Sequence, residues 1–148
     1  MASFTKLEQA VVAGKYRLDR IIGRGGFSAV YRGEHLAMGR PVALKVLDGS
    51  RAGGEDSKMM DRFEREARVI SQLEAPSTIT VFDYGVEGEL LYLVMEFVDQ
   101  GRTLRKEIQQ RARAKEGFEH GELQMIFDQV LNGLAAAHEQ NIIHRDVK

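Results

Sequence analysis

The sequence predicts an α+β fold in which a small antiparallel sheet precedes a helical region. Three observations carry this prediction. Short β-type runs alternate with glycine-bearing breaks between residues 16 and 47, apolar residues recur at helical spacing between residues 57 and 73, and the pattern is helical beyond Gly101. We therefore expect a five-stranded antiparallel sheet with one long helix, followed by a second, helical part.

The strands are expected where β-type residues run between turn signals. Their ranges are 16–22, 27–34, 41–47, 78–84 and 90–97, with a turn at 85–88 between the last two. Residues 1–15 show no sustained period and are expected to form a lead-in, with structure beginning near Tyr16. The domain organisation expected is therefore a lead-in at 1–15, a sheet-bearing lobe at 16–97, a hinge at 98–101 and an incomplete helical lobe at 102–148.

Two segments carry apolar stripes at helical spacing. The first helix would place on one face Met59, Met60, Phe63, Ala67, Ile70 and Leu73. In the second lobe the stripe consists of Leu123, Ile126, Phe127, Val130, Leu131 and Leu134, a pattern typical of a helix that packs inside a helical layer. The charged run from Arg102 to Glu116 predicts a solvated helix or insertion in preference to a nucleic-acid surface.

Composition excludes several classes of function. The 148 residues carry 21 Lys and Arg against 22 Asp and Glu, a net charge of −1, so no global field attracts nucleic acid or anionic lipid. Cysteine is absent, which excludes disulfides and cysteine nucleophiles and favours a cytoplasmic location. The longest apolar run, Leu90–Met95, is far short of the roughly 20 residues of a membrane-spanning helix. We expect neither a nucleic-acid partner nor a membrane segment.

The first motif with chemical meaning is the glycine-rich run from Ile22 to Val30. Glycines allow backbone amides to approach a phosphate closely. A dinucleotide-binding turn would lead directly into a helix, whereas the residues after this run continue as a strand and Ser28 stands where the third glycine is required. Taken alone, the run predicts equally well a glycine-rich hairpin that only turns the chain.

The second motif is Lys45 within an otherwise apolar strand. Desolvation of an unpaired ammonium is costly, so a buried lysine here requires an anionic partner. Glu66 lies three residues after Phe63 and four before Ile70 on the apolar stripe of the following helix, and it is therefore a better candidate than Glu64. The alternative is a lysine that extends to water from an edge strand.

The third motif, His144-Arg145-Asp146-Val147-Lys148, follows the long helix. A carboxylate with a lysine two residues later can orient a hydroxyl and place positive charge near a phosphoryl group. The alternative is an ordinary ion pair in a loop. A zinc site built from His138, Glu139 and His144 is disfavoured, because the two histidines are six residues apart instead of the required four.

These motifs, in this order, resemble those of the eukaryotic-like protein kinases, and most of all the bacterial serine/threonine kinases. The resemblance runs from about Tyr16 to Lys148. It implies an ATP-binding enzyme that transfers the γ-phosphate to serine or threonine hydroxyls of a protein substrate. The phosphate-covering loop would comprise Ile22, Gly23, Arg24, Gly25, Gly26, Phe27, Ser28, Ala29 and Val30.

The resemblance also implies roles for single residues. Lys45 would hold the α- and β-phosphates with Glu66 as its partner, while Asp146 would orient the substrate hydroxyl and Lys148 would lie near the γ-phosphate. Lysine at position 148 is the serine/threonine pattern. The remaining contacts implied are to the adenine ring, from Val30, Ala43, the gatekeeper Met95 and the hinge residues Glu96 to Val98.

The family pattern continues beyond Lys148. The Asn expected five residues after Asp146 and the DFG and APE segments are not in the sequence, so the magnesium ligands are expected beyond Lys148. We therefore expect the N-terminal half of a catalytic domain, inactive by itself, with exposed helices in its second lobe that favour self-association. The alternative function is a kinase-like module that binds nucleotide or protein without catalysis.

Overall fold

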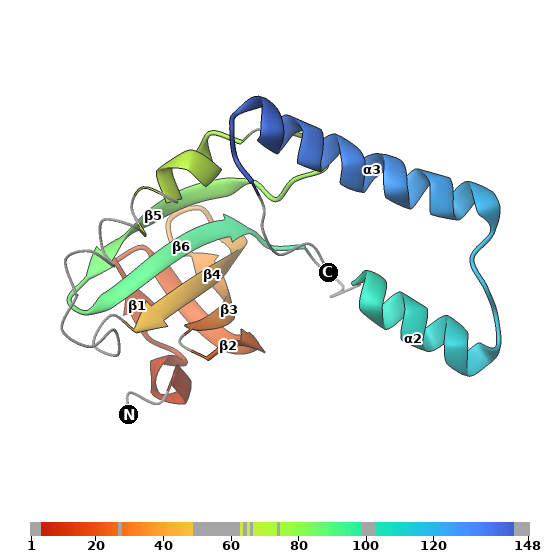
Figure 1. Ribbon diagram of the computed structural model, residues 1–148. Helices are drawn as coiled ribbons and strands as arrows, with labels where there is room; N and C mark the ends of the chain where they lie inside the picture. The colour runs from red at the N-terminus through yellow and green to blue at the C-terminus, as the bar shows by residue number, and fades with distance from the viewer. Residues whose placement is uncertain are drawn as a thin grey trace. The chain divides into compact units, whose positions relative to one another are not determined.

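The computed structural model describes residues 4–26, 28–48, 63, 65, 67–73, 75–98 and 103–143. By its contacts the chain divides into two compact units. The first comprises Met1–Gln72 with Ile79–Phe97, and the second comprises Leu73–Thr78 with Val98–Lys148. The first unit contains the sheet and the second contains two helices (Figure 1).

The first unit is built on a six-stranded antiparallel sheet in the order β1-β2-β3-β4-β6-β5. The strands are β1 (Val11–Val12), β2 (Tyr16–Arg24), β3 (Ser28–His35), β4 (Arg40–Asp48), β5 (Val81–Glu87) and β6 (Leu90–Glu96). The five expected strands are all present. The fourth strand begins at Val81 instead of residue 78, and it extends through Gly85 to Glu87. The turn after it is therefore at 88–89 and is shorter than the expected turn at 85–88.

The sheet curls until its two edges are joined by side chains. The Tyr16 hydroxyl in β2 donates to Asp83 Oδ2 in β5 at 2.7 Å, and the Ala13 N–H donates to Glu87 Oε2 at 2.7 Å. Burial and the Asp83 contact both raise the pKa of Tyr16, so its hydroxyl remains a donor at neutral pH. The curl encloses an apolar core that includes Leu18, Tyr31, Leu44 and Val94.

The N-terminal segment belongs to this core, and the prediction that structure begins near Tyr16 is wrong. The 3₁₀ helix η1 (Phe4–Leu7) and β1 precede that residue, and Phe4 and Val12 are 9% and 2% exposed within the core cluster. The buried Tyr31 hydroxyl donates to the Phe4 carbonyl oxygen at 2.5 Å. Segments this short have no measurable period, so only tertiary contact reveals them.

The helix expected near residues 57–73 is described only in part. Residues 63, 65 and 67–71 are helical, and Ala67 is 2% exposed, as its place on the apolar stripe predicts. Ile70, expected on the same stripe, remains 39% exposed. Most of the predicted stripe, including Met59 and Met60, lies outside the described residues.

The second unit contains α2 (Leu104–Ala114) and α3 (His120–Glu139). The Thr103 hydroxyl caps α2 by accepting from the Lys106 N–H at 3.2 Å, and α2 has no buried residue, in agreement with the solvated helix expected for this charged run. Gly133 of α3 is buried, and a Cβ there would lie 3.0 Å from the Ser77 carbonyl oxygen, so Ser77 packs closely on α3. Among the described residues, no helix is both long and apolar enough to cross a membrane.

Candidate functional site

Four of the predicted site residues share one face of the sheet. The strand register places Val30 of β3 opposite Lys45 of β4, and Ala43 of β4 opposite Met95 of β6. Because successive side chains of a strand alternate between faces, these four lie opposite the face that forms the core. The intervening residues of the same strands are core members, namely Ala29, Tyr31, Leu44, Val46 and Val94. We call the face that carries Val30, Ala43, Lys45 and Met95 the outer face.

The glycine-rich run forms the turn of an antiparallel hairpin. β2 ends at Arg24 and β3 begins at Ser28, with the Gly25 N–H donating to the Ser28 carbonyl oxygen at 2.8 Å. This confirms the strand that sequence analysis expects after the glycines and excludes a dinucleotide-binding turn here. A Cβ on Gly26 would meet no atom within 4 Å, so the backbone at this position is open to an approaching group.

Lys45 is exposed, and the interpretation of this residue as a buried cation is wrong. The alternative is confirmed in that Lys45 reaches water, but it is wrong about an edge strand, because β4 lies between β3 and β6 inside the sheet. The apolar residues on either side, Leu44 and Val46, face the core, whereas Lys45 points to the outer face. An exposed ammonium retains its hydration, so an internal carboxylate is not needed to offset desolvation, and the lysine is accessible to an external anion.

The residues predicted to contact adenine, and Ile22 of the glycine-rich run, differ in burial. Ala43 is 6% exposed and Val30 and Met95 are partly buried, whereas Ile22 and Val98 are 46% and 52% exposed. Glu96, the last residue of β6, is exposed and its N–H donates to the Thr80 carbonyl oxygen at 2.8 Å.

Ala29 of the predicted phosphate-covering loop turns its side chain away from the outer face. Its side chain is fully buried in the core, on the face opposite to Val30. Consecutive strand residues point to opposite faces, so Ala29 can offer only its backbone to a ligand on the outer face.

Several predicted site residues lie outside the described residues. They are Phe27 of the glycine-rich run, Glu66, and the catalytic pair Asp146 and Lys148. His144 of the disfavoured zinc site also lies there. Among the described residues, no group of three His, Cys, Asp or Glu side chains could hold a metal ion.

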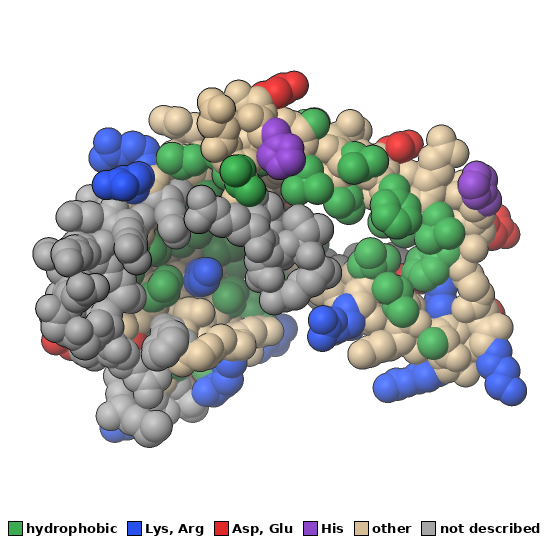
Figure 2. Space-filling view, viewed as in Figure 1, with side chains coloured by type: hydrophobic (Ala, Val, Ile, Leu, Met, Phe, Trp, Pro, Cys, Tyr) green, Lys and Arg blue, Asp and Glu red, His purple; other side chains and the backbone are tan. Residues whose placement is uncertain are grey.

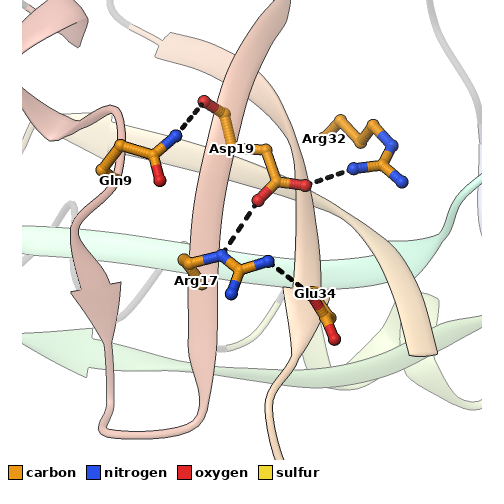
Figure 3. Close-up of polar contacts among 5 residues, drawn as sticks. All are labelled: Gln9, Arg17, Asp19, Arg32 and Glu34. Carbon is orange, nitrogen blue, oxygen red and sulfur yellow. Dashed lines mark hydrogen bonds and ion pairs between the residues drawn. The ribbon is translucent and has the colours of Figure 1, made fainter. Parts of the chain in front are cut away.

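Sequence analysis missed a polar network on β2 and β3. The Asp19 carboxylate accepts from Arg32 Nη1 and from Arg17 Nε, and Arg17 Nη2 donates to Glu34 Oε2 (Figure 3). The Gln9 side chain adds a bond to the Asp19 carbonyl oxygen. Alternating charges at positions 17, 19, 32 and 34 are the signal that predicts such a network once the two strands are paired.

A model of the protein kinase domain family matches residues 16–148 of this chain. That range contains all three motifs, the whole second unit, the first unit from Tyr16 onward and every residue of the outer face. The sheet of the first unit is thus a kinase N-lobe, and the second unit is part of a helical C-lobe.

Curated bacterial proteins are similar over most of the chain. Serine/threonine-protein kinase PrkC of Bacillus subtilis (strain 168) is 36% identical over 137 residues, 93% of this chain and 20% of that protein. Serine/threonine-protein kinase PknL of Mycobacterium tuberculosis is 39% identical over 142 residues, 96% of this chain and 34% of that protein. The probable serine/threonine-protein kinase PknB of Bifidobacterium longum is 33% identical over 97% of this chain and 21% of that protein. The chain therefore spans between a fifth and about a third of the length of these relatives.

Proposed function

The chain belongs to the protein kinase family, and we propose that the full-length protein transfers the γ-phosphate of ATP to serine or threonine hydroxyls of a protein substrate. One structural observation carries the proposal beyond family membership. Val30, Ala43, Lys45 and Met95, which come from three strands, meet on the outer face of one sheet. An apolar surface for a purine and a cation for its phosphates thus lie side by side.

The described residues would act mainly by binding and orienting the nucleotide. Val30, Ala43 and Met95 offer the apolar contact for the adenine ring. The exposed Lys45 ammonium, opposite Val30, would hold the phosphate oxygens, and the glycine turn between β2 and β3 would present its backbone to them. Fixing the triphosphate in one orientation lowers the entropic cost of reaching the transition state.

The remaining roles fall on residues outside the described part of the chain. We propose that Glu66 orients Lys45, that Asp146 orients the substrate hydroxyl and that Lys148 offsets charge at the γ-phosphate. Magnesium supplies charge neutralisation at the phosphates in this family, but the described residues contain no ligand set for it. We therefore assign no role to the metal here. The cytoplasmic location of the protein stays a prediction.

A lysine exchange in the full-length protein tests the proposal. Lys45→Met should lower the phosphotransfer rate at least about 100-fold, because it removes the charge that stabilises the transferring group. Transfer of ³²P from labelled ATP to a generic protein substrate measures the rate, and thermal unfolding confirms that the variant folds.

The matched control is Lys15→Met, which removes an exposed lysine of the same unit whose Nζ lies 3.9 Å from Asp83. We expect this variant to keep the parental rate. Equal rates for parent and Lys45→Met would refute the role of Lys45. A parent that binds ATP without any transfer would instead support the non-catalytic module.

A further inference from the structure

Three residues of the first unit form a bridge that the proposed function does not use. Arg32 of β3 donates through Nη1 to Asp19 Oδ2 of β2, and its guanidinium Cζ lies 5.6 Å from the centre of the Phe97 ring. Phe97 directly follows β6. We call Asp19, Arg32 and Phe97 the Arg32 bridge.

The bridge lies on the outer face. Arg32 follows Val30 by two residues, so the two side chains point the same way, and the register places Arg32 opposite Ala43. β4 separates β3 from β6 in the sheet. The contact between Arg32 and Phe97 therefore joins β3 to the segment that follows β6, across the intervening β4.

The chemistry of the contacts holds the guanidinium in one place. Asp19 is 18% exposed and also accepts from Arg17 Nε at 3.2 Å, so its carboxylate is fixed between two cations (Figure 3). A planar guanidinium can donate to a carboxylate and at the same time stack on an aromatic ring. Because a partly desolvated cation is attracted more strongly to an aromatic face, the partial burial favours the contact with Phe97.

We propose that Arg32 is a positioning residue for the nucleotide, which ties the strands of the glycine turn to the segment that follows β6. The inference rests on the proposed function, in which the purine contacts Val30, Ala43 and Met95. The register places Arg32 in the same cross-strand row as Ala43 and Met95, so the bridge lies directly beside these contacts. Loss of the bridge would let these elements separate, so ATP would bind less tightly while the bound phosphates would still reach Lys45.

The test uses the full-length protein and compares dissociation constants for ATP, measured by isothermal titration calorimetry. Arg32→Met and Phe97→Leu should each weaken ATP binding about fivefold, the size of an exposed cation–π contact. The double variant should bind ATP about as weakly as either single variant, because either change alone breaks the same contact. In steady-state assays KM for ATP should rise while kcat is kept.

Two further variants separate positioning from general stability. Glu34→Gln removes the Arg17–Glu34 pair of the same network and leaves the bridge intact, so we expect parental affinity for ATP. Arg32→Lys keeps the charge but loses the planar stack, so part of the affinity should return relative to Arg32→Met.

The outcomes distinguish this inference from the proposed function. Unchanged ATP affinity in Arg32→Met, or an equal loss in Glu34→Gln, would overturn the positioning role alone. A full-length parent that does not bind ATP would overturn the proposed function and the positioning role with it.

Discussion

Gly33 is a residue at which the sheet leaves no room for a side chain. A Cβ there would lie 2.4 Å from the Arg17 carbonyl oxygen and 2.7 Å from Leu44 Cδ1. The first atom belongs to the backbone of β2 and the second to the core, so displacing either of them costs free energy. Close approach, and not an unusual φ, accounts for glycine at this position.

We therefore expect Gly33→Ala to destabilise the 148-residue chain by about 1–3 kcal/mol, the usual cost of overpacking. The shift of the urea midpoint at constant slope measures this change. Gly117→Ala is the matched control, since a Cβ there meets nothing within 4 Å, and it should change stability by less than about 0.5 kcal/mol. Equal midpoints for Gly33→Ala and the parent would contradict the steric argument.

The direction of single side chains decides which predicted site residues are open to the outer face. Lys45 was expected to be buried because its strand is apolar, yet one face of that strand is open and the lysine occupies it. Ala29, in the predicted phosphate-covering loop, is one residue out of phase with Val30, so its side chain faces the core and only its backbone is open to the outer face. Both differences follow from the two-residue period of a strand, which assigns a side chain to a face only once the core side is known.

At the scale of elements, Arg111 joins α2 to α3. Its Nε donates to Glu107 at 2.9 Å, and Nη1 and Nη2 donate to the Glu122 carboxylate at 2.7 and 2.8 Å. Nη1 also donates to the Gly117 carbonyl oxygen, and the guanidinium stacks on Phe118 with 4.2 Å between Cζ and the ring centre. One side chain thus organises the whole connection between the two helices.

This cluster makes the helix pair sensitive to acid. The hydrogen bonds from Arg111 and from the Glu119 N–H lower the pKa of Glu122 from its ordinary 4.5 to about 2. A carboxyl whose pKa is lower in the folded state contributes stability that is present above pH 4.5 and is lost as the pH falls towards 2. We expect the protection of amide hydrogens in residues 104–123 to fall over this range of pH.

Glu122→Gln should reduce protection at neutral pH and flatten its dependence between pH 4.5 and 2. The comparison variant is Glu116→Gln, which removes an exposed carboxylate from the same connection. It should show the same dependence of protection on pH as the parent. Hydrogen exchange measured by mass spectrometry gives the protection of residues 104–123 in each variant as a function of pH. A profile for Glu122→Gln that follows the parent would show that this carboxyl does not couple the helices to pH.

At the scale of the whole molecule, the second unit leaves much apolar surface uncovered. Leu123, Phe127, Val130 and Leu131 of the predicted stripe are 38 to 61% exposed. Figure 2 shows hydrophobic side chains gathered along α3. Only Gly133 and Ala137 of this 20-residue helix are buried. A continuous apolar face of this kind favours association.

We accordingly expect the 148-residue chain to self-associate, with an apparent mass that rises with concentration in sedimentation velocity experiments. Exchanging Phe127 and Leu131 for Glu should return the chain to a monomer, because charges on this face oppose its burial. Exchanging the exposed polar residues Gln129 and Asn132 of the same helix for Glu adds the same charge without removing apolar surface. A monomer at every concentration in the parent, or the same loss of association in both variants, would contradict this expectation.

The sequence by itself determined the order of the five longer strands and the helical character of the second unit, because strand runs, glycine turns and helical stripes are local patterns. It also determined the family, since the motifs keep their residues and spacing whatever the packing. Only the tertiary structure decided which residues of each strand face the core, how η1 and β1 join it, and that Arg32 contacts both Asp19 and Phe97. These features depend on contacts between segments far apart in the chain, and each results from register and sheet curl, which no local pattern encodes.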